Sequence, residues 1–314
     1  MPREFNDLLE EVGRLDRLVS ELGNDADATL ALQTKLSEIR STISEFVTKT
    51  NIQNSSDVDK IKTELEWHAF SVRQLIMQRK RLFKIFELAS RSLHHASASF
   101  VADLLCSVEN TETQFYQDIF CLLLSGGKRD GYFVEFGACD GLAISNTLLL
   151  ERQFGWKGIL AEPATTWHES LFKNRTSIID TRCVWSRSNE VLNFTETEDA
   201  LESSAVLEEG EQQVRSSYDV NTISLEDLLS EHKAPSTIDY LSMDVEGSEA
   251  VILESFPFSN YRFEFISLEH RKDTEEAHLI DLMGRNGYRQ VLREFSGVDG
   301  FYVPEDKAAK LNLN

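Results

Sequence analysis

Residues 131–141, with the sequence GYFVEFGACDG, give the clearest indication of the fold. Its first six residues are mostly apolar, as in a buried strand. Gly137 and Gly141 then bracket a turn, and a helix is predicted from about residue 145 to residue 154. A strand that leads through a glycine-bearing turn into a helix is the opening unit of an α/β sheet, whose ligands bind at the carboxyl ends of the strands.

The chain continues this alternation of strands and helices as far as residue 303. We predict further strands at 158–161, 177–184, 238–243, 263–268, 288–293 and 300–303. Helices are predicted at 166–173, at 224–231 with Ser224 as N-cap, and at 274–286. The alternation indicates a mostly parallel sheet. Residues 190–220, rich in Asp, Glu, Ser and Thr, are predicted to be a mobile, solvated insertion, for which a substrate lid is one possible role.

The first hundred residues follow a different pattern. Apolar residues are spaced alternately three and four apart over residues 5–22, and two further stretches of this kind follow at 32–46 and 58–86. This is the spacing of a coiled-coil seam. We therefore predict two domains: an α-helical coiled-coil or bundle domain, residues 1–98, that makes a homo-oligomer, and an α/β domain, residues 99–314.

Composition excludes several classes of protein. The 314 residues are 41% hydrophobic, which is typical of a globular protein, and the net charge of −21 disfavours nucleic acid as a partner. The sequence contains no apolar run of about 18 residues, so no transmembrane segment is predicted. The acidic N-terminus is unlike a secretory signal, and the four cysteines are too few for a disulfide scaffold. We expect a cytoplasmic protein.

Two acids are predicted at the tips of neighbouring strands, Glu135 and Glu162. The second is placed to accept hydrogen bonds from the two hydroxyls of a ribose. The G-x-G-x-x-G fingerprint of dinucleotide sites is absent, which disfavours NAD. The two acids suit a nucleoside without a pyrophosphate. S-adenosylmethionine fits, because its cationic groups favour an acidic pocket.

A second group of acids follows the strands predicted at 238–243 and 263–268. Asp244 and Glu246 are two residues apart and point the same way along an extended segment, and Glu269-His270 could converge on them. A hydroxyl needs a base or a metal ion to become a nucleophile at neutral pH. One mechanism has His270 or Asp244 as general base, with Glu246 as a further catalytic candidate. The other has Asp244, Glu269 and His270 bind Mg²⁺ or another divalent cation.

Three runs, FVEFGACDGLAISNTLLLERQFGWKGILAEP, IDYLSMDVEGSEAVIL and ISLEH, resemble the FkbM-type methyltransferases. These are a branch of the class I S-adenosylmethionine-dependent enzymes, and the resemblance covers residues 130–303. It implies a Rossmann-like, seven-stranded, mostly parallel sheet and O-methyl transfer, often to sugars or glycans. The cofactor-binding residues that it implies are Glu135, Gly137, Ala138, Asp140, Asn146, Glu162, Pro163, Cys183, Val184 and Asp244. Among these, Glu135, Gly137 and Asp140 would line the methionine end, Glu162 would hold the ribose, and Cys183–Val184 would lie near the adenine.

The sequence thus predicts an S-adenosylmethionine-dependent O-methyltransferase. The acceptor is expected to be a hydroxyl of a glycan, such as a polysaccharide or a lipid-linked glycan, with peripheral association with a membrane-bound glycan assembly system. Two alternatives stay open at this point. One is a small-molecule O-methyltransferase, and the other is a non-catalytic coiled-coil interaction protein whose methyltransferase domain is degenerate.

Overall fold

The computed structural model describes Arg81 and residues 98–197, 214–245, 247–270, 273–293 and 295–311. It divides the chain into two compact units, Met1–Lys84 and Ile85–Asn314. All the elements below belong to the second unit. The coiled coil predicted for residues 1–98 lies almost entirely outside the described residues. Both the coiled coil and the domain boundary at residue 98 therefore stay predictions.

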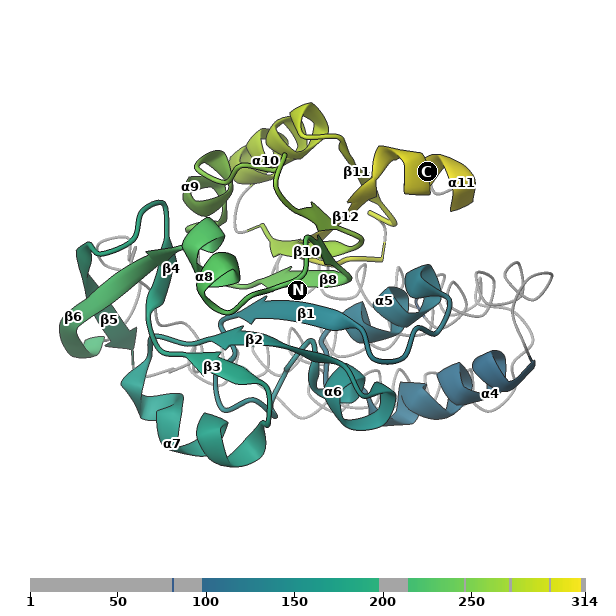
Figure 1. The fold of residues 1–314 in the computed structure, drawn as a ribbon, viewed down its shortest axis with the longest axis horizontal. Coiled ribbons are helices and arrows are strands. Elements are labelled where there is room, and N and C mark those ends of the chain that lie inside the picture. The colour runs from purple at the N-terminus through teal and green to yellow at the C-terminus, as the bar shows by residue number, and fades with distance from the viewer. Residues whose placement is uncertain are drawn as a thin grey trace, which may run out of the picture. The chain divides into compact units, whose positions relative to one another are not determined.

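A seven-stranded sheet forms the centre of the second unit, in the order β11-β12-β10-β8-β1-β2-β3 (Figure 1). β1 pairs in parallel with β2 on one side and with β8 on the other, and β8 pairs in parallel with β10. β12 runs antiparallel to both of its neighbours, β10 and β11. The predicted Rossmann-like, mostly parallel sheet is confirmed. Its strands are β1 (Tyr132–Phe136), β2 (Lys157–Ala161), β3 (Ile178–Asp180), β8 (Tyr240–Met243), β10 (Ile266–Glu269), β11 (Tyr288–Val291) and β12 (Asp299–Pro304).

Helices cover both faces of the sheet because successive strand residues point to opposite sides. Phe133 of β1 packs into the core that contains residues of α4 (Ala98–Ser107), α5 (Gln117–Ser125) and α6 (Leu148–Phe154). Val134, the next residue, packs into the core of α8 (Leu225–Glu231), α9 (Glu249–Glu254) and α10 (Asp273–Arg285). Figure 1 shows the two groups of helices on opposite sides of the sheet. The remaining helices are the 3₁₀ turn Val108–Asn110, α7 (Thr165–Asn174) and α11 (Glu305–Leu311).

Three predicted strands are each divided in two. The strand expected at 177–184 ends at Asp180, whose side chain accepts a hydrogen bond from the Arg182 backbone N–H at 3.0 Å and so makes a turn. The chain then continues as β4 (Cys183–Trp185), which leaves the main sheet and pairs with β6. The strands expected at 238–243 and 263–268 likewise begin with short segments, β7 (Thr237–Ile238) and β9 (Arg262–Phe263), which pair with each other.

The acidic segment 190–220 is ordered at both of its ends. β5 (Val191–Thr197) and β6 (Val214–Ser224) form an antiparallel hairpin with register from Val191 opposite Asn221 to Thr197 opposite Val214. The prediction of a mobile, solvated insertion is therefore wrong for these strands, and residues 198–213 lie outside the described part. At the end of β6, the Ser224 hydroxyl accepts a hydrogen bond from the Asp227 backbone N–H at 3.1 Å, which confirms the predicted N-cap. No helix in the described ranges is long and apolar enough to cross a membrane.

Candidate active site

The loop of residues 137–141 lies between the ends of β2 and β8. Gly137 has φ +73°, and a Cβ there would lie 1.9 Å from the Asp244 backbone oxygen, so only glycine allows this approach. On the other side, the Cys139 backbone N–H donates to the Glu162 carboxylate at 2.8 Å. The loop is thereby fixed between the tips of the two strands that flank β1.

Carboxylates surround this loop. Burial raises the pKa of the Cys139 thiol, and so do the charges of its neighbours, Glu162, Asp244, Glu135 and Asp140. Four acids predicted from three separate strands are therefore brought to one place. A cationic ligand would be attracted to such a cluster.

Glu162, one residue beyond β2, is only 4% exposed. Its carboxylate accepts backbone hydrogen bonds from Cys139 at 2.8 Å and from Ala164 at 2.7 Å. Burial raises the pKa of Glu162 to about 7, against the lowering effect of these two bonds; the charges of Glu196 and Asp244 add to the rise. A carboxylate oxygen can accept more than one hydrogen bond, so Glu162 retains acceptor capacity for a pair of hydroxyls.

Glu135, in β1, is buried and its carboxylate is occupied by the residues that follow the loop. It accepts hydrogen bonds from the Asn146 backbone N–H at 2.7 Å and from the Thr147 hydroxyl at 2.5 Å. The Ser145 hydroxyl lies 3.2 Å from both of its oxygens, and the Arg175 guanidinium is 3.6 Å away. These contacts turn residues 145–147 toward the sheet, so α6 begins at Leu148 and not at the predicted residue 145.

Asp140 and Asn146 shape the same loop. The Asp140 carboxylate accepts hydrogen bonds from the backbone N–H groups of Leu142 and Ala143, each at 2.9 Å, which makes a tight turn. Asn146 donates through its side-chain nitrogen to the Ser242 hydroxyl at 2.9 Å. Its side-chain oxygen is buried and has no hydrogen-bond partner. A buried acceptor of this kind is costly unless a ligand or water supplies a donor.

The remaining cofactor candidates are largely buried. Ala138 is buried within the loop itself, and Pro163 follows Glu162 directly. Cys183 and Val184 are buried in β4, and burial together with the Glu162 charge raises the pKa of the Cys183 thiol to about 12.

The β5–β6 hairpin is attached to the beginning of α7, just beyond Glu162. The Tyr218 hydroxyl donates to the Glu196 carboxylate at 2.6 Å and accepts from the Thr165 backbone N–H at 2.8 Å. Glu196 also accepts from the Thr166 backbone N–H at 3.2 Å. Desolvation raises the pKa of Glu196, but the hydrogen bonds, led by the one from Tyr218, lower it below its ordinary value. These two side chains satisfy N–H groups at the start of α7 that its own N-cap, Ala164, leaves without a side-chain partner.

The catalytic candidates are distributed differently. Asp244 is exposed at the tip of β8, beside the loop. His270 follows β10, and its ring lies against Gly300 and 3.2 Å from the Tyr302 hydroxyl. Burial lowers the pKa of His270; the charge of Glu276 in α10 opposes this shift, and that of Arg293 adds to it. The groups that act on His270 thus belong to β12, α10 and the chain after β11. Glu246 lies outside the described residues.

The metal prediction gains no support. Among the side chains that the structure describes, no three His, Cys, Asp or Glu residues come together as a group that could hold a metal ion. The predicted ligands Asp244, Glu269 and His270 are therefore not assembled as a set.

Comparison with known proteins agrees with this geometry. The family model described as "Methyltransferase FkbM domain" matches residues 135–290. Residues 135–290 are an FkbM methyltransferase domain. None of the curated proteins matches the chain. One solved structure, a crystal structure of a mutant of MtNAS, matches with 12% identity over 97% of this chain and 99% of that chain, at a TM-score of 0.32.

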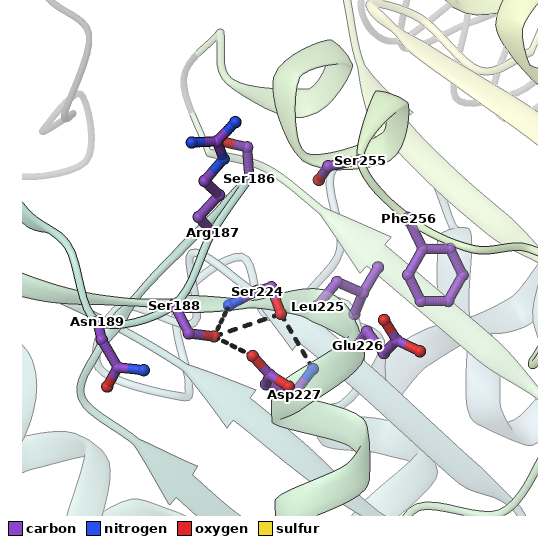
Figure 2. Close-up of a pocket in the computed structure, with 10 residues that line it drawn as sticks. All are labelled: Ser186, Arg187, Ser188, Asn189, Ser224, Leu225, Glu226, Asp227, Ser255 and Phe256. Atoms are coloured by element: carbon purple, nitrogen blue, oxygen red, sulfur yellow. Dashed lines mark hydrogen bonds between the residues drawn. The ribbon is translucent and has the colours of Figure 1, made fainter.

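The FkbM domain also contains a polar cavity of about 340 Å³ (Figure 2). It lies between residues 186–189, the beginning of α8 and the end of α9. The Ser188 hydroxyl accepts from the Ser224 backbone N–H at 2.9 Å and donates to the Asp227 carboxylate. None of the predicted cofactor or catalytic residues lines this cavity.

Sequence reasoning missed four residues of the FkbM domain that hold the site together: Arg175, Glu151, Tyr218 and Glu196. Arg175 and Glu151 lie at or near helix ends, where charged residues are ordinarily solvated. Tyr218 and Glu196 fall in the segment that we took for a solvated insertion. Their partners are distant in sequence, so no local pattern marks them.

Proposed function

We propose that this FkbM methyltransferase uses S-adenosylmethionine and methylates a hydroxyl group of a sugar or glycan. The observation that carries the proposal is the cluster of Glu135, Glu162 and Asp244 around the loop of residues 137–141. Three adjacent parallel strands supply these acids at the edge of the sheet where α/β proteins bind ligands.

The residues present suit this cofactor. Glu162 retains acceptor capacity for the two ribose hydroxyls, and the buried Asn146 oxygen lacks a donor that an ammonium group could supply. We assign the ribose to Glu162, the methionine end to the loop with Asn146, and the adenine to the neighbourhood of Cys183–Val184. When bound, the cofactor would supply a methyl group from its sulfonium: the methyl carbon would bond to the hydroxyl oxygen as its bond to sulfur breaks, and S-adenosylhomocysteine would leave as the neutral thioether.

The chain's own contribution is to orient the acceptor and to remove its proton. Asp244 is our choice as general base, because it is exposed and lies beside the loop. His270 is the second candidate. Its lowered pKa keeps the ring neutral at pH 7, but the ring is hydrogen-bonded to the Tyr302 hydroxyl. Base catalysis needs no assembled set of metal ligands, which favours it over the metal-assisted mechanism.

Calorimetric titration of the full chain with S-adenosylhomocysteine, with and without Mg²⁺, tests the cofactor. We expect micromolar binding that Mg²⁺ does not change, and weaker binding by Glu162→Ala. Glu226→Ala is a matched control, since Glu226 lines the separate cavity and bonds Asn260. No binding by the wild-type chain would contradict the proposal.

A screen of acceptors tests the substrate class. Sugars, polysaccharides and small phenolic or aliphatic alcohols would be incubated with labelled S-adenosylmethionine, and the methylated product located by mass spectrometry. Methylation of sugar hydroxyls is expected. Methylation of small alcohols alone would favour the small-molecule alternative.

We further propose that residues 1–98 make the protein a homo-oligomer and that it acts in the cytoplasm. The heptad-like spacing of residues 5–22, 32–46 and 58–86 supports self-association. Sedimentation of the full chain at several concentrations measures the oligomeric state, and a monomer throughout would contradict this part of the proposal.

A further inference from the structure

Arg175, at the end of α7, is fully buried, which is unusual for an arginine. Its Nε donates to the Glu151 carboxylate at 3.0 Å. The other contacts of its guanidinium reach the chain between β1 and α6: the Gly141 carbonyl at 3.2 Å, the Ser145 hydroxyl at 2.9 Å and the Thr147 hydroxyl at 2.8 Å. One side chain thus holds three points of the chain segment that follows β1.

Two carboxylates offset the cost of burying this charge. Glu151 lies 3.0 Å from the guanidinium and Glu135 lies 3.6 Å away. Although desolvation raises the pKa of Glu151, the charge of Arg175 and hydrogen bonds from Ser177 and Thr176 lower it, so Glu151 is ionised at neutral pH. A buried arginine between two acids is tolerated only when its remaining N–H groups also find acceptors, and the loop supplies them.

The loop and Arg175 also fit one another sterically. Gly141 has φ +76°, and a Cβ there would lie 2.5 Å from the Arg175 Cγ. The stem of the arginine therefore occupies the space that the missing side chain leaves. Thr147 connects the two charges directly, because its hydroxyl donates to Glu135 and accepts from Arg175.

We propose that Arg175 is a positioning residue for cofactor binding, which holds residues 141–147 so that Asn146 and the loop of residues 137–141 keep the geometry that the cofactor requires. This inference rests on the proposed function. Arg175 makes none of the backbone pairing of β1 with β2 and β8, so its loss should displace the loop more than the sheet. Displacement of binding groups by about 1 Å can weaken their action by as much as about a hundredfold.

The test is S-adenosylhomocysteine affinity, measured by calorimetry on full-length Arg175→Lys and the wild type. Lysine retains the charge but lacks the planar fork that reaches several acceptors at once. We expect Kd to rise about tenfold or more while KM for the acceptor stays within about twofold, a split that a general loss of stability would not give. Arg262→Met is the control; it removes contacts with Glu264 at 2.7 Å and Asp306 at 2.8 Å, outside the seven-stranded sheet, and should leave Kd unchanged.

If Arg175→Lys does not fold, a pair of variants at Thr147 tests the positioning role of Arg175. Thr147→Val removes the hydroxyl between Glu135 and Arg175 with little change of shape, and Thr147→Ser restores it. Weaker binding by the first and recovery by the second support the proposal. Unchanged binding by folded Arg175→Lys, or by Thr147→Val, overturns it while the proposed function stands. Absence of binding by the wild type overturns both.

Discussion

The loop after β1 and the tips of β8 and β10 share one edge of the sheet, but they are built in opposite ways. Around the loop, Glu135, Glu162 and Arg175 are each less than 5% exposed and hydrogen-bonded to several groups. At the tips, Asp244 is exposed and His270 is partly exposed. We infer that the first region serves as a fixed cradle and the second faces the acceptor. Substitutions in the first should therefore cost stability, and substitutions in the second should cost activity.

The largest expected effect is on the buried side of this comparison. Glu135→Gln would remove the charge opposite Arg175 and place an N–H₂ group among donors. We expect the free energy of unfolding to fall by about 3 kcal/mol, because breaking a buried ion pair leaves its partner uncompensated. Urea denaturation followed by tryptophan fluorescence measures it. Glu305→Gln, in an exposed pair with Arg289, should cost no more than about 0.5 kcal/mol, and equal losses in the two variants would show that burial is not decisive.

At the tips of β8 and β10, a substitution should lower activity and leave stability almost unchanged. Asp244→Asn is expected to lower methyl transfer about a hundredfold, the usual contribution of a general base, while the free energy of unfolding changes by less than about 0.5 kcal/mol. The rate would be measured with the acceptor found in the screen. Asp281→Asn, in an exposed pair with Arg285 on α10, is the control. Full activity in Asp244→Asn would move the role of base to His270, and His270→Gln would then be the variant to measure.

The pKa of Glu162 predicts that cofactor affinity depends on pH. Its pKa of about 7 means that the ionised fraction rises from about 0.1 at pH 6 to about 0.9 at pH 8, and the ionised form is the better acceptor for ribose hydroxyls. We expect Kd for S-adenosylhomocysteine to fall about tenfold over this range. Glu162→Gln should bind weakly with no such dependence. A wild-type Kd that does not vary with pH would contradict the role of Glu162.

The same pKa determines the sign of a stability effect. The folded value lies above the ordinary value of 4.5, so folding retains a proton at Glu162. Its contribution to stability is present below about pH 4.5 and is lost as the pH rises through 7. Burial also raises the pKa of Asp118 to about 7, so Asp118 changes the stability in the same direction. The difference in free energy of unfolding between wild type and Glu162→Gln, measured across this pH range, therefore gives the contribution of Glu162.

Much of the cradle could be predicted because its signals are local. The apolar run 132–136 and Gly137 lie in consecutive positions, and the tip of each strand is read directly from the sequence. The side-chain contacts that hold the loop and the hairpin in place could not be predicted. Arg175 contacts Ser145 across 30 residues, and Tyr218 contacts Glu196 across 22 residues in the β5–β6 hairpin, so each pairing exists only once the chain has folded. The acidic composition of residues 190–220 led to a wrong prediction, because Glu196, although it belongs to this acidic segment, is only 4% exposed and is hydrogen-bonded.

The smallest expected effect concerns the hairpin, which extends the buried region over the start of α7. Tyr218→Phe would remove the hydroxyl that bridges Glu196 and the Thr165 backbone N–H. The Thr165 N–H loses its acceptor, which costs about 1 kcal/mol, whereas Glu196 retains the Thr166 and Ser216 donors and loses little, so we expect a total loss of about 1 kcal/mol. Tyr261→Phe, outside the hairpin, serves as the control. If Tyr218→Phe also weakens S-adenosylhomocysteine binding several-fold, the hairpin belongs to the cradle, because α7 begins only three residues after Glu162. If Kd is unchanged, the fixed region ends at Glu162 and the hairpin contributes stability alone.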